Sequence, residues 1–165
     1  MPPPYSSDVK WEKTIKVITS GNIIDVNNAV SIGGFDEALF IDEVDHEFCF
    51  RGIKNGLFIY QCTRGIYLLH KIGNPIEIKI MGKVYHPPAH NYVRTYYIIR
   101  NRLYMIRRYW NLDIKWTINH YFGNTARLIV SKIFFEEDKY RKIKSIYYGI
   151  MDCILGRMGK KYFKY

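Results

Sequence analysis

Short apolar runs broken by turn residues dominate the first half of the chain. Residues 14–19 (TIKVIT) are rich in β-branched side chains and end at a Ser-Gly-Asn turn, a pattern that predicts a buried strand. A Thr-Arg-Gly turn at 63–65 separates two further runs, and the last run alternates apolar and polar residues. These runs predict strands over 57–61, 66–69 and 76–85.

Helical spacing marks other segments and dominates after residue 91. Residues 25–32 and 42–56 end at glycines, and Asp42 has the residue type of an N-cap for the second helix. The helix predicted over 92–110 has one apolar stripe and five arginines outside it. Its stripe contains Tyr92, Tyr96, Ile99, Leu103, Ile106 and Trp110. Two more helices are predicted over 125–135 and 138–155, so we expect an α/β portion over 1–85 and a helical region over 86–165.

Length and composition exclude several classes of protein. The chain has 165 residues, of which 48% are hydrophobic and 24% charged, as expected for a soluble domain with a sizeable core and not for a disordered chain. Its three cysteines show no metal-ligand spacing and favour free thiols over a disulfide scaffold. We find neither a signal-peptide pattern nor an apolar run long enough for a transmembrane helix.

The net charge of +10 hides two different halves. Residues 1–78 carry 7 basic and 10 acidic side chains, a net charge of −3. Residues 79–165 carry 18 basic and 5 acidic side chains, a net charge of +13. Most of the aromatic residues also lie in the basic half, so this half is expected to meet an anionic partner.

The most informative stretch is 32–56, which concentrates acidic residues between two glycine breaks. A carboxylate at a helix N-terminus is stabilised in its charged form and can accept a proton from a hydroxyl or help hold a hard cation. Acids at this position also simply stabilise helices, and the residues alone leave both interpretations open. The group comprises Asp36, Glu37, Asp42, Glu43, Asp45, His46 and Glu47.

The stretch resembles the acceptor-side motif of family 2 glycosyltransferases, which are inverting enzymes of the GT-A fold. The resemblance rests on Gly33-Gly34-Phe35-Asp36-Glu37, Phe40, Asp45, Glu47 and Arg51, with the upstream Thr19 to Asn22 and the later Tyr96-Tyr97 and Arg100-Asn101. Together these segments look most like the bacterial rhamnosyltransferase-like branch. The resemblance implies a partial GT-A-like α/β fold that contains only the C-terminal half of such an enzyme.

The resemblance implies that Asp45 is the general base, although Val44 stands where many members have Glu. Asp42 and Glu43 are expected to be a helix cap and a solvated helix acid. Glu47 either bonds the acceptor or stabilises its helix, and Arg51 either pairs with Glu47 or holds leaving-group charge. The residues expected to bind substrate are Ser20, Gly34, Asp36, Glu47 and Arg51.

A divalent cation, Mg²⁺ or Mn²⁺, is also implied by the resemblance. His70 is a candidate ligand, and a structural histidine is the alternative. The family's Asp-x-Asp motif is absent from this chain. We therefore expect that a separate N-terminal nucleotide-binding half is required and that the 165-residue chain alone is inactive.

The implied partners are a nucleoside-diphosphate sugar, a glycan or lipid-linked acceptor and an anionic membrane surface, with the arginines of 92–110 facing lipid phosphates. The implied reaction is transfer of a sugar such as rhamnose in bacterial surface-polysaccharide synthesis. The implied location is the cytoplasm, at the inner face of the plasma membrane. A non-catalytic interaction module derived from a glycosyltransferase is the alternative, and a nucleic-acid-binding domain is disfavoured because no known module accompanies the charge.

Overall fold

The computed structural model describes residues 9–65, 78–80, 83–85, 91–134 and 138–163. These residues form two compact units. Unit 1 draws on 1–36 and 44–71, and unit 2 on 37–43 and 72–165. The boundary expected at residue 85 stays a prediction. The described elements combine helices with small antiparallel sheets, which is compatible with the expected α/β class, while the GT-A-like fold also stays a prediction.

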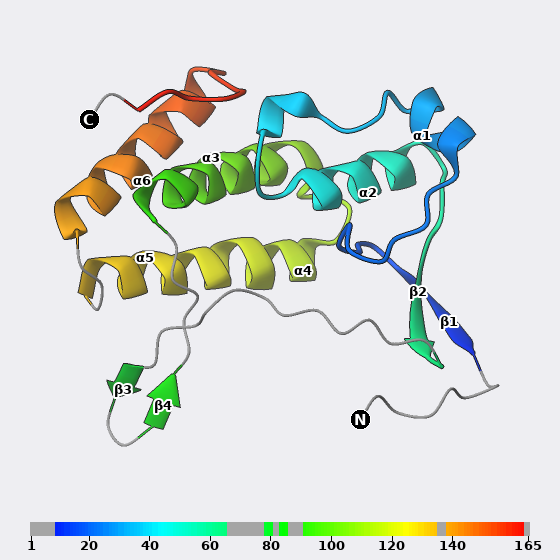
Figure 1. Ribbon diagram of the computed structural model, residues 1–165, viewed down its shortest axis with the longest axis horizontal. Coiled ribbons are helices and arrows are strands. Elements are labelled where there is room, and N and C mark those ends of the chain that lie inside the picture. The colour runs from blue at the N-terminus through cyan, green and yellow to red at the C-terminus, as the bar shows by residue number, and fades with distance from the viewer. Residues whose placement is uncertain (1–8, 66–77, 81–82, 86–90, 135–137, 164–165) are drawn as a thin grey trace. The chain divides into compact units, whose positions relative to one another are not determined.

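Unit 1 contains a two-stranded antiparallel ribbon and two helices (Figure 1). Asp25 caps the first helix by accepting a hydrogen bond from the amide of Asn28 at 2.8 Å. The second helix has acids in its first turn and Arg51 and Lys54 in its last, the distribution that the helix dipole favours. The elements are β1 (Lys10–Thr14), α1 (Val26–Ser31), α2 (Val44–Lys54) and β2 (Ile59–Arg64).

The strands of unit 1 differ from the prediction. The buried strand predicted over 14–19 is wrong, because β1 ends at Thr14 and its side chains are mostly exposed. Among the described strands β1 pairs with β2 alone, so its sheet has two strands and leaves most of the β1 side chains exposed. β2 continues through Arg64, and a turn follows at Gly65 with a φ of 91°. The strand predicted over 66–69 lies outside the described residues.

Unit 2 is mainly helical (Figure 1). A short β-hairpin pairs Ile78 with Tyr85 and Ile80 with Lys83 where a single strand was predicted. The elements are η1 (Glu37–Leu39), β3 (Ile78–Ile80), β4 (Lys83–Tyr85), α3 (Tyr92–Tyr109), α4 (Ile114–Thr117), the π-helix η2 (Ile118–Gly123), α5 (Asn124–Phe134) and α6 (Lys139–Ile154).

Helices α3 and α6 pack against each other and form the centre of unit 2 (Figure 1). The two helices lie close together at Gly149, where an added Cβ would lie 2.9 Å from the carbonyl oxygen of Tyr96 and 3.2 Å from the Cβ of Ile99. A side chain at this position would collide with the α3 backbone. Gly149 therefore sets how close the two helices come.

The burial of α3 extends beyond the predicted stripe. All seven residues from Thr95 to Asn101 are buried, whereas Trp110, expected in the stripe, is 55% exposed. Arg100 is fully buried and Arg102 is half-buried, so these two arginines do not face lipid phosphates. Arg94, Arg107 and Arg108 are exposed, and the membrane contact stays a prediction. Within the described part of the chain, no helix is both long enough and apolar enough to cross a bilayer.

Candidate functional site

A glycine turn follows α1 and leads into the predicted acceptor loop. Gly33 and Gly34 have φ values of 88° and 67°, which side-chain-bearing residues rarely adopt. The Gly34 amide donates to the carbonyl of Ala29 at 2.8 Å and closes the helix. The next residue, Phe35, places its ring 4.6 Å from that of Phe48 on α2. The loop is thus attached to the helix that bears the predicted base.

Arg51 provides the second attachment of this loop. Its guanidinium binds the Glu47 carboxylate through Nε at 3.0 Å and Nη2 at 2.8 Å. The same group donates to the carbonyl of Gly34 at 2.6 Å and to that of Ile32. The Arg51–Glu47 pairing expected from the sequence is confirmed, and it also fixes the backbone of 32–34. Substrate-binding roles for Gly34, Glu47 and Arg51 stay predictions.

Asp45 lies in the first turn of α2 and is half-buried. Its Oδ1 accepts a hydrogen bond from the amide of His46 at 3.0 Å. Asp45 and Glu47 are two residues apart, about 200° around the helix, so their carboxylates leave it on different sides. Glu47 faces the glycine loop, and Asp45 shares its side of α2 with Phe48 and Cys49.

That side of α2 borders a cavity of about 350 Å³ within unit 1. Cys49 lines it, and its pKa is raised by burial and further by the nearby charge of Asp45. Ser20, another predicted substrate contact, lies in an exposed turn two residues before the cavity-lining Asn22. Asp36 is half-buried at the end of the loop. The other lining residues include Val17, Ile24, Asn28, Leu57 and Tyr60.

Two acids assigned to the start of α2 belong instead to unit 2. Asp42 and Glu43 have φ values of 63° and 65°, and the helix begins only at Val44. Asp42 is therefore not the N-cap; its carboxylate accepts hydrogen bonds from Nε and Nη2 of Arg94 at 2.8–3.2 Å. Glu43 is buried, bonded to Arg102 at 3.3 Å and to the Tyr121 hydroxyl at 3.1 Å, and is not a solvated helix acid.

Arg100 and Asn101 hold the segment 37–43 by its backbone. Arg100 donates to the carbonyls of Ala38 and Leu39 and, at 2.7 Å, to that of Gly159. Asn101 donates to the carbonyls of residues 39, 41 and 42 at 2.7–3.0 Å. The sequence predicts no structural role for either residue, and Arg100 is among the arginines expected to face lipid phosphates. Their position amid apolar residues of a helix was the available signal, because fully buried polar side chains need partners.

A polar cluster ties the end of the described chain to α3. Asp152 accepts hydrogen bonds from Tyr96 at 2.9 Å and from Lys161 at 2.5 Å. Burial raises the pKa of Tyr96 to about 12, and the bond to Asp152 adds to this. Burial alone would favour protonated Asp152, but the bonds from Lys161 and Tyr96 outweigh it and hold its pKa below the ordinary value. The charged side chains of Asp152 and Lys161 therefore stabilise the packing of unit 2.

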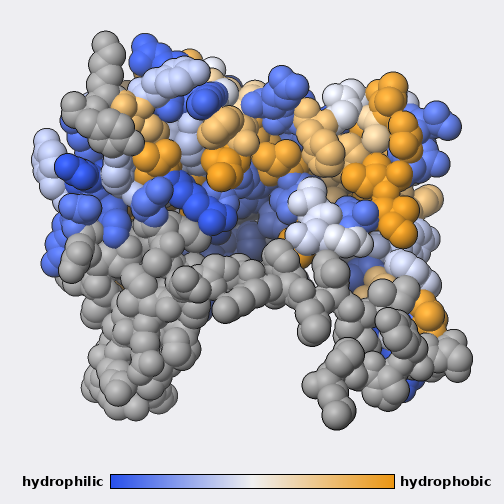
Figure 2. Space-filling view, viewed as in Figure 1, coloured by the Kyte–Doolittle hydropathy of each residue, from blue (hydrophilic) through white to orange (hydrophobic). Residues whose placement is uncertain are grey.

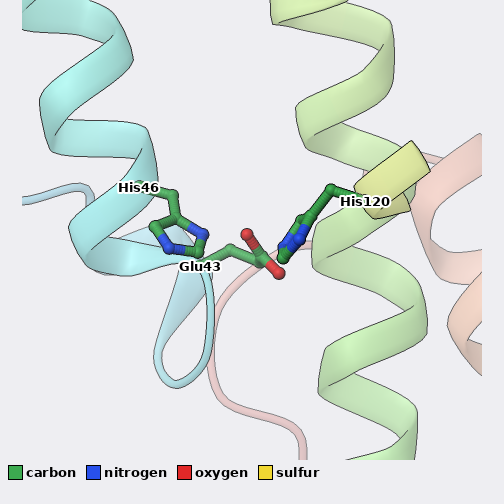
Figure 3. A group of neighbouring side chains, drawn as sticks. All are labelled: Glu43, His46 and His120. Atoms are coloured by element: carbon green, nitrogen blue, oxygen red, sulfur yellow. The ribbon is translucent and has the colours of Figure 1, made fainter. Parts of the chain in front are cut away.

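Within either unit taken alone, the described residues offer no ready set of ligands for the expected divalent cation, which stays a prediction. Figure 3 shows the Glu43 carboxylate and the His120 ring pointing toward each other in unit 2, drawn with His46 of unit 1. Glu43 already binds Arg102 and Tyr121, and the His120 ring stacks on Trp116 at 4.5 Å. Among the described residues of each unit by itself, no group of three acidic, histidine or cysteine side chains lies close enough to share a metal ion. His70, the predicted ligand, lies outside the described residues.

Comparison with known proteins relates part of the chain to sugar transferases of the rhamnosyltransferase type. The relative is dTDP-rhamnosyl transferase RfbF of Shigella flexneri, which is 34% identical over 96 residues. The aligned stretch covers 58% of this chain, and the chain spans about a third of the relative's length, 31%. No model of a known protein family matches the chain, and no solved structure matches it.

Proposed function

We propose that the chain is the acceptor-side part of an inverting family 2 glycosyltransferase that transfers rhamnose or a related sugar. The observation that carries the proposal is the 34% identity to a dTDP-rhamnosyl transferase. The geometry of unit 1 is consistent with it. A half-buried Asp45 stands at the N-terminus of α2, the helix to which the glycine loop is attached and whose Phe48 and Cys49 line the cavity.

In the proposed reaction, Asp45 accepts the proton of an acceptor hydroxyl while the hydroxyl oxygen attacks the anomeric carbon of the donor. The bond between that carbon and the diphosphate breaks, the anomeric configuration inverts and a nucleoside diphosphate leaves. Asp36, Ser20 and the Gly34 backbone would border the acceptor, and Glu47 and Arg51 would hold the loop. No step proposed for these residues involves a metal ion.

The donor site, the cation and the location are also proposals. The relative's name supports a deoxythymidine-diphosphate sugar as donor. We expect the nucleotide site and its Mg²⁺ or Mn²⁺ on a separate N-terminal half, and a glycan or lipid-linked acceptor at the inner face of the plasma membrane. On this proposal the 165-residue chain alone transfers no sugar.

A chimera provides the test. Residues 1–165 would replace the matching part of the Shigella relative, and transfer from dTDP-rhamnose to the relative's acceptor would be measured. Asp45→Asn should lower kcat at least about 10²-fold, the scale of lost general-base catalysis. Asp138→Asn is the matched control, because Asp138 is exposed, lies in unit 2 and makes no side-chain capping hydrogen bond. Unchanged transfer by the Asp45→Asn chimera would remove Asp45 from the mechanism.

A non-catalytic interaction module is the second candidate. It is favoured by apolar side chains that unit 1 exposes around α1, visible as a hydrophobic area in Figure 2. Ile23 is 93% exposed, and Val26 and Val30 are each 72% exposed. A chimera that folds and binds nucleotide but transfers no sugar would favour this candidate.

A further inference from the structure

Helix α6 has two sharply different faces. Its inner face packs on α3 through buried residues that include Ser145, Gly149 and Asp152. Its outer face carries a line of exposed apolar side chains spaced alternately by three and four residues. We name this line the α6 stripe; it comprises Tyr140, Ile143, Tyr147, Ile150 and Ile154, which are 76%, 49%, 58%, 37% and 66% exposed.

The stripe runs the length of the helix. α6 has 16 residues, about 24 Å at 1.5 Å per residue. Scattered apolar residues on a surface are ordinary, but a continuous row on one helix face usually marks a surface that something covers. Tyr148 and Leu155, 37% and 53% exposed, widen the row on one side.

The surroundings of the stripe are basic. Exposed Lys139, Arg141 and Lys144 lie at its N-terminal end, and exposed Arg157 and Lys160 follow its C-terminal end. Residues 138–163 contain seven basic and two acidic side chains. One of those acids, Asp152, is buried and bound to Lys161, so it does not offset the charge of the outer face.

We propose that the α6 stripe docks onto an anionic bilayer surface and lies in the headgroup region. Isoleucines would enter the boundary of the acyl chains, tyrosines suit the interface, and the flanking cations would meet lipid phosphates. An anionic bilayer surface matches both the apolar row and the charge. A second copy of the chain would bring like charges together, and a nucleic acid would leave the isoleucines uncovered.

This proposal does not depend on sugar transfer, and it differs from the sequence-based expectation in its location. That expectation placed the lipid contact on the arginines of α3, two of which are buried or half-buried and bonded within unit 2. The structure assigns the contact to α6 instead.

Vesicle co-sedimentation tests the proposal with the full chain. The wild-type protein should sediment with vesicles containing phosphatidylglycerol and not with pure phosphatidylcholine vesicles, and added salt should weaken the binding. Ile143→Ser/Ile150→Ser should reduce partitioning at least about tenfold, and Arg141→Glu/Lys144→Glu should do so by a similar factor. All four substituted side chains are exposed, so both variants should keep the wild-type circular dichroism.

The matched control is Val26→Ser/Val30→Ser on α1, which removes apolar side chains that are even more exposed, 72% each, from the other unit. It should bind vesicles like wild type. The proposal is overturned if wild type does not bind anionic vesicles, or if the isoleucine pair binds as well as wild type. It is also overturned if light scattering shows a dimer that the isoleucine pair abolishes, or if DNA competes for α6 and vesicles do not.

Discussion

Replacing Arg51 separates a structural role of this residue from a chemical one. In the folded protein its guanidinium forms a charge pair with Glu47 and binds two carbonyls of the glycine loop. The Glu47 side chain is 1% exposed and that of Arg51 is 17% exposed, so water screens the pair little. Arg51→Ala would leave a buried carboxylate without its guanidinium.

Breaking a buried pair from one side costs about 3–5 kcal/mol. Arg51 is partly open to solvent, so we expect the low end, a loss of about 3 kcal/mol in the free energy of unfolding. Arg51→Lys keeps the charge but loses the fork that reaches two carbonyls and a carboxylate at once, and should cost roughly 1–2 kcal/mol. A double-mutant cycle with Glu47→Gln should give a coupling energy of about 2 kcal/mol.

Urea unfolding measures these energies, and hydrogen exchange of residues 32–36 measures the attachment of the loop. Both Arg51 variants should show faster exchange in this loop and little change in α6. If the free energy of unfolding of Arg51→Ala lies within about 0.5 kcal/mol of the wild-type value, the attachment of the loop by Arg51 contributes little to stability. If instead Arg51→Lys keeps its stability and loop protection while the chimera loses kcat, Arg51 acts on the leaving group.

Further predictions concern unit 2. Gly149→Ala should lower the free energy of unfolding by about 1–3 kcal/mol because its Cβ would meet the α3 backbone, whereas Gly123→Ala, with its nearest atom at 3.9 Å, should be near neutral. The lowered pKa of Asp152 contributes stability above the unfolded pKa of about 3.9, and this is lost as the pH falls through the lower folded value. Urea midpoints should therefore drop in acid, and less so for Asp152→Asn. The raised pKa of Tyr96 should remove stability between about pH 10 and 12, and Tyr96→Phe should flatten that loss.

The sequence predicted the helices and contacts that depend on residues close together in the chain. The helices predicted over 25–32 and 138–155 agree with α1 and α6 to within one residue at each end. The pairing of Arg51 with Glu47 was also predictable, since it spans one helical turn.

Features that depend on distant segments were not predictable. The strand over 14–19 has the right composition, but strand pairing, which a local pattern does not contain, placed β1 earlier. Asp42 and Glu43 have the sequence position of acids at the start of a helix. Their partners in the fold, Arg94 and Arg102 of α3, are more than fifty residues away in the sequence and cannot be predicted from local pattern. The burial of Arg100 likewise depends on carbonyls about sixty residues distant.

The division of the chain between its units has a practical consequence for dissecting the protein. Unit 2 takes the short segment 37–43 from the middle of the sequence stretch that builds unit 1. An excised fragment starting at residue 72 would lack the carbonyls that Arg100 and Asn101 bind and would bury unsatisfied donors. Such a fragment should express poorly, and a synthetic peptide carrying residues 37–43 should rescue its solubility by complementation in trans.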